Sequence, residues 1–265
     1  VSTDYDTSDI LFFEPITKSR VNDIVNGLGE NLLGSIVQFG GQTPLKIAND
    51  IGTILGSSPS SIDICEDRKL FNNMISRLGF KQPPGFISNT ILEAQEAKDK
   101  LGYPVLVRPS YVLGGKCMHI CYNDKEFNSA VFKAYDASNG KPLLIDKFLS
   151  NAIEYDVDVV CDVFGNHEIA AIMEHIEEAG IHSGDSSCII PSLNLKATHK
   201  KEIEVICSVL CKELKVVGLM NIQLAIKNDV VYIIEVNPRA SRTVPFASKA
   251  TGIPWAKIAT YLCMG

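Results

Sequence analysis

Three side chains that carry oxygen interrupt two otherwise apolar runs near the end of the chain. Gln223 lies in the run 221–226, and Glu235 and Asn237 lie at the end of the run 230–237. An unpartnered polar group among such neighbours costs about 1–3 kcal/mol, and a charge costs more. Mg²⁺ binds carboxylate and amide oxygens. The pattern therefore indicates a metal site, and an edge strand with solvated polar residues explains it equally well.

The metal interpretation requires one particular register between the two runs, which are typical of a β-hairpin. Gln223 lies opposite Glu235 only if the hairpin pivots on Asp229 in a three-residue loop. A two-residue turn at Asn228 and Asp229 would pair Gln223 with Ile234 and put Glu235 on the other face. We therefore expect the three-residue loop if these residues bind a metal together.

Two arginines follow the hairpin directly, at Arg239 and Arg242. The planar guanidinium group fits carboxylate or phosphoryl oxygens. Beside a Mg²⁺ site, two such groups indicate phosphoryl transfer, in which catalysis consists mostly of positioning and charge neutralisation. Surface arginines paired with nearby carboxylates are the alternative.

Two loops carry weaker signals. The Gly-containing loop 110–115 offers backbone N–H groups that can bind phosphate, but it lacks the P-loop pattern and no helix follows, so a plain turn also explains it. The segment 174–187 concentrates carboxylates together with His175 and His182. Composition leaves open whether that segment binds a metal, surrounds another ligand or is a solvated loop.

The elements that must position these residues fall into three parts. A strand over 35–39, a helix over 43–51 and a strand over 53–55 predict a βαβ unit with parallel strands. A helical pattern covers 60–78, and a small α+β unit covers about 84–150. Antiparallel strands and one helix follow, over 153–163, 167–175, 198–215, 221–226 and 230–236.

Composition excludes several classes of protein. The 265 residues are 46% hydrophobic and 21% charged, with 19 Gly and 12 Pro, which excludes disorder, collagen and coiled coil. A net charge of −6 without a Lys/Arg cluster argues against nucleic-acid or membrane partners. No apolar run approaches the roughly 18–20 residues of a membrane helix. The polar start lacks Met and is no signal peptide, which predicts a fragment of a longer protein.

The eight cysteines form no CxxC pair and lie mostly in apolar runs. They are typical of reduced core thiols in a reducing, cytoplasmic compartment. Cys207 and Cys211, four apart on a predicted helix, have His199 upstream, but a zinc site would need a fourth ligand that the sequence does not offer.

Strings spread along the chain resemble one known family. They include Val107-Arg-Pro-Ser-Tyr-Val-Leu-Gly-Gly115 and Ile234-Glu-Val-Asn-Pro-Arg239, with further matches at 1–9, 38–45, 56–59, 66–68, 154–158, 172–185, 218–221 and 240–246. These strings resemble the large subunit of carbamoyl phosphate synthase. The residues Thr243-Val-Pro after the second arginine fit the second, C-terminal ATP-grasp half of that subunit.

The resemblance implies an α/β and α+β architecture. Residues 1–60 would form part of a parallel-sheet, Rossmann-like pre-ATP-grasp domain, and 61–265 an ATP-grasp domain with a small lid over about 84–150. The chain would use ATP to phosphorylate carbamate to carbamoyl phosphate for pyrimidine and arginine biosynthesis. The implied partners are the rest of the large subunit, a glutaminase subunit or domain, and the small substrates bicarbonate, carbamate and ammonia.

The resemblance also implies roles for single residues. Arg68 and Arg108 would bind the ATP phosphates, and Gly114 and Gly115 of the lid would close over them. Lys147 and Leu149 would line the adenine slot, and Glu154 would bind the ribose hydroxyls. The nucleotide wall would consist of Gly180, Ile181, His182 and Ser183. Gln223, Glu235 and Asn237 would bind two Mg²⁺ or Mn²⁺ ions against the ATP phosphates, and K⁺ would be a further cation. Asn237, Arg239 and Arg242 would be catalytic.

Two alternatives stay open. Another ATP-grasp carboxylate–amine ligase or carboxylase, such as a biotin carboxylase, would carry Glu-Met-Asn in place of Glu235-Val-Asn-Pro-Arg. A nucleotide-binding module without catalysis would not need the carboxylate, amide and arginines that this chain retains at 235–242.

Overall fold

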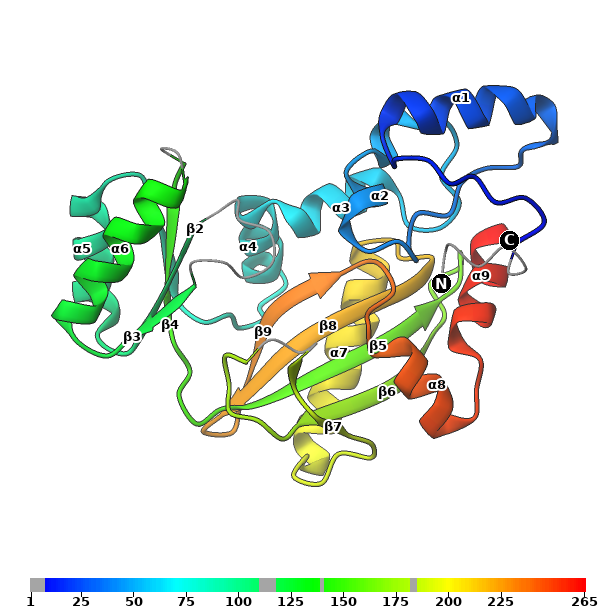
Figure 1. The fold of residues 1–265 in the computed structure, drawn as a ribbon. Helices are drawn as coiled ribbons and strands as arrows, with labels where there is room; N and C mark the ends of the chain where they lie inside the picture. Colours follow the sequence, from blue (N-terminus) through cyan, green and yellow to red (C-terminus); the bar gives the residue numbers. More distant parts are fainter. Residues whose placement is uncertain (1–7, 110–117, 139–140, 182–184) are drawn as a thin grey trace.

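The computed structural model describes residues 8–109, 118–138, 141–181 and 185–265 (Figure 1). Its centre is a five-stranded antiparallel sheet in the order β7-β6-β5-β8-β9. The strands are β5 (Ile153–Cys161), β6 (His167–His175), β7 (Cys188–Ile189), β8 (Gly218–Lys227) and β9 (Val230–Asn237). The four antiparallel strands predicted for this region are confirmed, and β7 is an addition.

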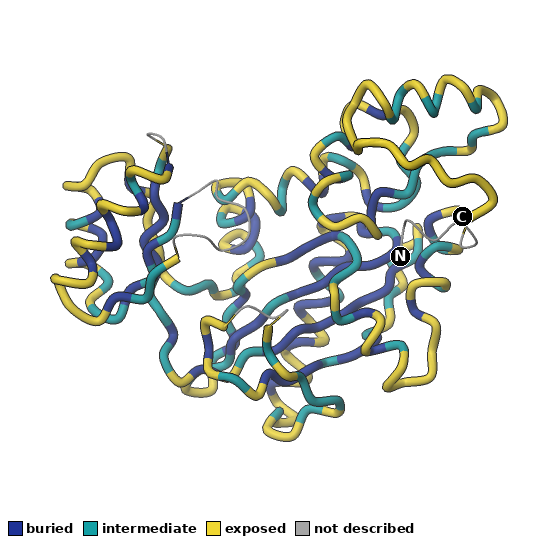
Figure 2. The backbone as a smooth tube through the Cα atoms, in the orientation of Figure 1, coloured by how far each residue is buried: buried dark blue, intermediate teal, exposed yellow. Residues whose placement is uncertain are grey.

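One face of this sheet packs against α7 (Ala197–Glu213) and α4 (Arg68–Arg77). Alternate strand residues such as Tyr155 and Val157 point into this core, where they meet one apolar face of α7 that includes Ile203. Burying such a side chain contributes about 1.5–3 kcal/mol. Figure 2 shows the strands buried along most of their length, so the sheet is a firm platform for whatever its other face carries.

The opposite face of the sheet is covered only in part. α8 (Val244–Thr251) and α9 (Trp255–Met264) cover one end of it, with Val244, Ala247 and Trp255 in the contact. The uncovered part carries the polar residues of β5, β8 and β9 described below.

A second, four-stranded antiparallel sheet forms the small unit predicted over about 84–150, which we call the lid. Its order is β1-β4-β2-β3. The lid consists of β1 (Gly85–Ser88), α5 (Ile91–Leu101), β2 (Val105–Pro109), β3 (His119–Cys121), α6 (Asp124–Ser138) and β4 (Leu143–Lys147). These helices and strands confirm the α+β composition predicted for this unit. In Figure 1, α4 lies between the lid and the large sheet.

The N-terminal region departs most from the prediction. It contains α1 (Lys18–Leu28), α2 (Gln42–Leu45), α3 (Pro59–Glu66) and short 3-10 turns over Gly29–Asn31 and Ala48–Asp50. The two predicted parallel strands reduce to a single parallel bridge between Ser35 and Ile54. Their direction is right and their extent is wrong, because a single pair without further strands provides too few ladder hydrogen bonds.

Both helices predicted in this region are divided. The helix predicted over 43–51 breaks where Ile47 leaves helical geometry, at φ −108° and ψ 3°. The pattern over 60–78 splits at Asp67, which is extended and accepts a hydrogen bond from the Leu70 N–H at 2.8 Å. Asp67 therefore caps α4, and the apolar spacing over 60–78 does not by itself reveal a break at this residue.

The hairpin that carries the metal-site prediction has an unexpected construction. Its turn has two residues, Asn228 and Asp229, both at positive φ (50° and 61°), so the predicted three-residue loop is wrong. A β-bulge between β8 and β9 then places one extra residue, Ile234, in β9. Gln223 pairs with Glu235 after all.

Two further predictions concern the thiols and the membrane. The seven described cysteines are free, and five of them are buried. Cys207 and Cys211 lie buried on α7, and within the described ranges no three His, Cys, Asp or Glu side chains gather as a zinc site would require. No helix in the described part of the chain is long and apolar enough to cross a membrane.

Candidate active site

Two rows of polar side chains cross the face of the large sheet that is opposite to α7, and most of these side chains are buried. Strand pairing aligns Asp156, Gln223 and Glu235 in one row and Asp158, Asn221 and Asn237 in the next. Val231, Ile233 and Val236 of β9 pack into the α7 core, so Glu235 and Asn237 face the other way. The bulge at Ile234 is what allows this, because without it Glu235 would point into the core.

Glu235, Asn237 and Arg239 form a connected series at the end of β9. The Asn237 amide Nδ2 donates to Glu235 Oε1 at 2.7 Å, and Arg239 Nη2 donates to Asn237 Oδ1 at 3.1 Å. Arg239 Nη1 donates to the Ala240 carbonyl at 2.9 Å. Arg239 Nε is buried without a hydrogen-bond partner among the described residues. These neutral contacts leave the charge of Arg239 uncompensated.

Arg242 is exposed and has no ion pair with any described residue. It stands three residues after Arg239, in the segment that joins β9 to α8. Both predicted catalytic arginines therefore keep their charge available at one edge of the polar rows.

The other two predicted arginines share a carboxylate. Asp146 of β4 is 5% exposed and forms ion pairs with both Arg68, at the start of α4, and Arg108 of β2. The Arg108 contacts are 3.1 Å from Nη2 and 3.2 Å from Nε to Oδ2. Burial lowers the pKa of Arg68, and the neighbouring Asp146 opposes that shift. A Cβ at Gly85 would lie 2.0 Å from Asp146 Oδ1, so only glycine fits beside this link between lid and body.

The predicted ribose-binding carboxylate lies at the start of β5. Glu154 Oε1 accepts a hydrogen bond from the Gly180 N–H at 3.0 Å, and burial raises the pKa of Glu154. Gly180 has φ 95°, and a Cβ there would lie 2.8 Å from Phe148 Cε2. Glycine is therefore required at this bend.

An apolar patch lies beside Glu154, on the same face of the sheet as the polar rows. It is made of Leu149, Ala152, Ala179 and Ala225, with Tyr232 and Ile234 packed against them. Leu149, a residue predicted for the adenine slot, belongs to this patch, and Ile181 is exposed nearby in sequence. The four patch residues are buried and Tyr232 and Ile234 are half-buried, so the patch offers apolar neighbours next to a carboxylate, which is a combination that a nucleoside site needs.

Lys147 differs from the other predicted adenine-slot residue. Its Nζ donates to the carbonyls of Gly102 and Tyr103, at 2.9 and 2.8 Å. Burial lowers the pKa of Lys147, and Lys227 adds to that shift. The side chain thus holds a lid loop together in this structure.

His175 of β6 lies next to Glu154 and Asp156 of β5. Its Nε2 is 2.8 Å from Asp156 Oδ2, its Nδ1 is 3.7 Å from Glu154 Oε2, and the ring is buried. Burial alone would lower the pKa of His175, but the hydrogen bond to Asp156 and the charges of Asp156 and Glu154 outweigh it and raise that pKa. His175 therefore interacts with the two carboxylates and belongs to no metal-binding cluster among the described residues.

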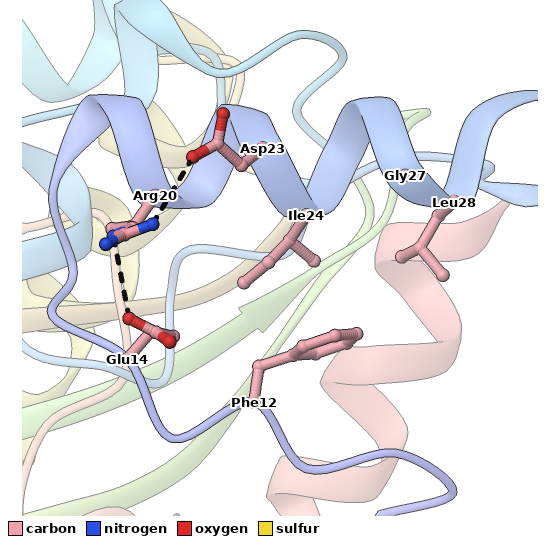
Figure 3. A pocket seen from close by; sticks show the side chains of 7 residues that line it. All are labelled: Phe12, Glu14, Arg20, Asp23, Ile24, Gly27 and Leu28. Atoms are coloured by element: carbon pink, nitrogen blue, oxygen red, sulfur yellow. Dashed lines mark ion pairs between the residues drawn. The ribbon is translucent and has the colours of Figure 1, made fainter.

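Four of the predicted site residues, Gly114, Gly115, His182 and Ser183, lie outside the described residues. The remaining ones lie in the lid, at the start of α4, on strands β5, β8 and β9, and in the segments that directly follow β4, β6 and β9. A separate groove of about 360 Å³ lies between segment 12–14 and α1 (Figure 3). Its charged residues are paired with each other, at 3.6 Å for Arg20–Glu14 and 3.8 Å for Arg20–Asp23, and it contains none of the predicted residues.

Sequence reasoning misses several residues that organise this site. It does not identify Asp146 as the shared partner of Arg68 and Arg108, and it does not detect Asp158 and Asn221 of the second polar row. The available signal is an alternation of acid and apolar residues at Glu154-Tyr-Asp-Val-Asp158, which puts three carboxylates on one face of a strand.

Comparison with solved structures identifies the fold. The biotin carboxylase domain of Hydrogenobacter thermophilus 2-oxoglutarate carboxylase, solved with MgADP and bicarbonate, superposes with a TM-score of 0.79 at 21% identity, over 98% of this chain and 61% of that one. The N5-carboxyaminoimidazole ribonucleotide synthetase of Thermus thermophilus gives 0.62 at 14% identity, over 79% and 54%. The chain therefore has the ATP-grasp fold, which defines its class.

Sequence comparison identifies the family within that class. Residues 67–265 match the family model described as "Carbamoyl-phosphate synthase L chain, ATP binding domain", and 1–64 match "Carbamoyl phosphate synthase preATP-grasp domain". The carbamoyl phosphate synthase large chains of Xanthomonas campestris pv. campestris and Archaeoglobus fulgidus are 50% and 53% identical over this whole chain. The chain belongs to the family of carbamoyl phosphate synthase large chains, and it spans about a quarter (25%) of those relatives.

Proposed function

We propose that this chain transfers the γ-phosphoryl group of ATP to carbamate, as the second ATP-grasp half of a carbamoyl phosphate synthase. The observation that carries the proposal is the second arginine pair. Arg239 contacts Asn237, which contacts Glu235, and Arg242 follows three residues after Arg239. Neither arginine forms an ion pair with a described residue, and a phosphoryl group at this place would need both cation ligands and positive charge. The family membership and the Thr243-Val-Pro string support the choice of half.

The proposed nucleotide pose follows the chemistry of the surfaces. The apolar patch around Leu149 would take the adenine, and Glu154, held by the Gly180 N–H, would accept hydrogen bonds from the ribose hydroxyls. Arg68 and Arg108 would meet the phosphates, where the ATP charge would compete with Asp146 for them. Gly114 and Gly115 would close over the phosphates from the lid.

The oxygen donors suit Mg²⁺ or Mn²⁺ bound together with ATP. One carboxylate and two amides, from Glu235, Gln223 and Asn237, are too few for an all-protein cage but are typical of Mg²⁺ that keeps waters and substrate phosphates as ligands. These three residues would hold the two proposed ions. When bound, the ions would neutralise phosphate charge and orient the transferred group. K⁺ is a further cation that we propose to test.

In the proposed reaction a carbamate oxygen attacks the γ-phosphorus and the bond to the β–γ bridging oxygen breaks, giving carbamoyl phosphate and ADP. Arg239 and Arg242 would neutralise the charge that moves onto the transferred group. Fixing Arg239 through Asn237 avoids reorganisation during transfer. The rest of the large chain would supply carbamate made from bicarbonate and ammonia, with a glutaminase subunit or domain as ammonia source, for pyrimidine and arginine biosynthesis.

The reverse partial reaction tests the proposal. The native polypeptide that carries residues 1–265 is mixed with carbamoyl phosphate and MgADP, and ATP formation is followed by a coupled assay. We expect ATP to form and to depend on the divalent ion. Binding of MgADP without ATP formation would favour a non-catalytic module, and ATP-dependent carboxylation of biotin would favour the biotin carboxylase alternative.

A further inference from the structure

We propose that Asp158 is a positioning residue for phosphoryl transfer, whose buried carboxylate fixes the segment 241–243 and so determines where Arg242 lies. The inference rests on the proposed function, in which Arg242 neutralises charge on the moving phosphoryl group. It concerns residues that contact the neighbours of Arg242 and do not themselves contact the phosphoryl group.

The carboxylate of Asp158 is 1% exposed and collects three neutral donors. Its Oδ1 accepts from Ser241 Oγ at 2.8 Å and from Asn221 Nδ2 at 2.9 Å. Its Oδ2 accepts from Thr243 Oγ1 at 2.7 Å. Asn221 Nδ2 also donates to Asp156 Oδ1 at 3.0 Å, so one amide group connects the two aspartates of β5. No cation pairs with Asp158 among the described residues, so these donors alone offset the cost of burying its charge.

The two hydroxyl donors flank Arg242 in sequence. Ser241 and Thr243 both reach the same carboxylate, and the Thr243 N–H also donates to Ser241 Oγ at 3.2 Å. One residue further back, the Ala240 N–H donates to the Gln38 carbonyl at 3.1 Å. The backbone is therefore tied on both sides of Arg242, while the Arg242 side chain is exposed.

The chemistry favours positioning over simple stabilisation. A short connection between β9 and α8 does not require a buried carboxylate, since the backbone groups of ordinary turns form hydrogen bonds with each other and with water. A fixed guanidinium, by contrast, needs a rigid base, because a displacement of about 1 Å at a reacting centre can cost about 10²-fold in rate. The Asp158 contacts hold the two neighbours of Arg242 without touching Arg242, which leaves its charge for a ligand.

The test compares two replacements at position 243 in the native polypeptide. Thr243→Val keeps the shape and removes the hydroxyl, and Thr243→Ser keeps the hydroxyl. We expect Thr243→Val to lower reverse-reaction turnover by about 10- to 100-fold, with the KM for ADP changed less than about twofold. Thr243→Ser should recover most of the loss.

A matched control separates position from stability. Thr251→Val on α8 also removes a hydrogen-bonded hydroxyl, which donates to the Ala247 carbonyl at 2.8 Å and accepts from Trp255 Nε1 at 3.0 Å and from the Ile253 N–H at 3.4 Å. Its melting temperature should fall about as much as that of Thr243→Val, and its turnover should stay at the wild-type value. Equal losses of turnover in the two variants would overturn the inference.

A double-mutant cycle with Arg242→Ala gives the decisive readout. If Thr243 acts through Arg242, then Thr243→Val should change turnover by less than about twofold once Arg242 is absent. Multiplying effects would overturn the inference. A harmless Thr243→Val beside a severe Arg242→Ala would refute this inference alone, whereas a fully active Arg242→Ala would refute the proposed function itself.

Asp158→Asn provides a second route to the same answer. Asparagine retains one acceptor oxygen and replaces the other with an NH₂ donor, so a hydroxyl that donates to that atom in the wild type must turn and accept instead, and the negative charge is lost while the volume stays the same. The folded variant, checked by its thermal melt, should show the same turnover loss with unchanged KM for ADP. A loss expressed only in KM would contradict a role through Arg242.

Discussion

The four arginines of the candidate site form two pairs that are held in opposite ways. Arg68 and Arg108 share the buried carboxylate of Asp146, so one negative charge offsets half of their combined positive charge before any ligand arrives. Arg239 contacts an amide and a carbonyl, and Arg242 contacts no described carboxylate. The first pair joins the lid to α4, and the second lies on the rigid end of β9.

This difference separates two tasks. A pair that must release a carboxylate to accept phosphate gains less on binding, but it links nucleotide binding to the position of the lid. A pair with uncompensated charge is costly in the free protein and becomes most useful where charge develops during transfer. We therefore expect the Asp146 pair to affect nucleotide affinity and lid stability, and the second pair to affect turnover.

The largest expected effect is that of Arg242→Ala. Loss of an electrostatic stabiliser should lower reverse-reaction turnover by about 10²–10³-fold while MgADP affinity changes little. Arg242→Lys keeps the charge but loses the planar fork, so it should recover only part of the rate. Coupled-assay rates beside calorimetric affinities measure both quantities, and a loss confined to affinity would place Arg242 on ground-state phosphate.

Glu235→Gln should have the next largest effect. It keeps the shape and removes the only carboxylate of the proposed metal set, so turnover should fall by about 10²-fold, equivalent to about 2.7 kcal/mol of barrier. Because the described contact of Glu235 is a neutral one, from the Asn237 amide, the thermal melt should stay close to that of the wild type. Unchanged turnover at any Mg²⁺ concentration would remove the metal assignment.

Asp146→Asn tests the compensated pair. It leaves two guanidinium groups facing each other across the link between lid and body, so the free energy of unfolding should fall by about 1–3 kcal/mol. Added ATP supplies the missing negative charge, and it should therefore raise the melting temperature of the variant more than that of the wild type. Equal protection by ATP in both proteins would show that ATP does not meet Arg68 and Arg108.

The smallest effect concerns pH and His175. Because the pKa of His175 is raised above its ordinary value of 6.5, the folded state holds the proton more tightly than the unfolded state does. Its contribution to stability is complete below about pH 6.5 and is lost as pH rises through the raised pKa. His175→Gln should flatten this slope, as measured by urea unfolding at a series of pH values. The same slope in both proteins would assign the pH dependence to other groups.

Much of the fold follows from spacing in the sequence, and the exceptions have physical causes. The strands, α7 and the lid helices show clear apolar periodicity. The bulge at Ile234 cannot be seen in this periodicity, because it forms to turn Glu235 away from a core that other side chains already fill. The extent of the strands near Ser35 and Ile54 depends on partner strands that short-range pattern does not reveal.

The candidate site was foreseeable as a set of residue types and much less as a set of contacts. Gln223, Glu235, Asn237 and the arginines are unusual enough in sequence to be noticed singly. The sharing of Asp146 by Arg68 and Arg108 joins residues 78 and 38 positions apart, and the approach of Thr243 to Asp158 spans 85 positions. Such pairings arise only when the sheet and the lid are assembled.

The most direct test of the central claim measures two variants side by side in the native polypeptide. MgADP affinity and the rate of ATP formation from carbamoyl phosphate are determined for Arg108→Ala and for Arg242→Ala. We predict that Arg108→Ala weakens nucleotide affinity more than it slows transfer, and that Arg242→Ala slows transfer with little change in affinity. If both variants lose the same quantity to the same extent, the two pairs do not have separate tasks and the account is contradicted.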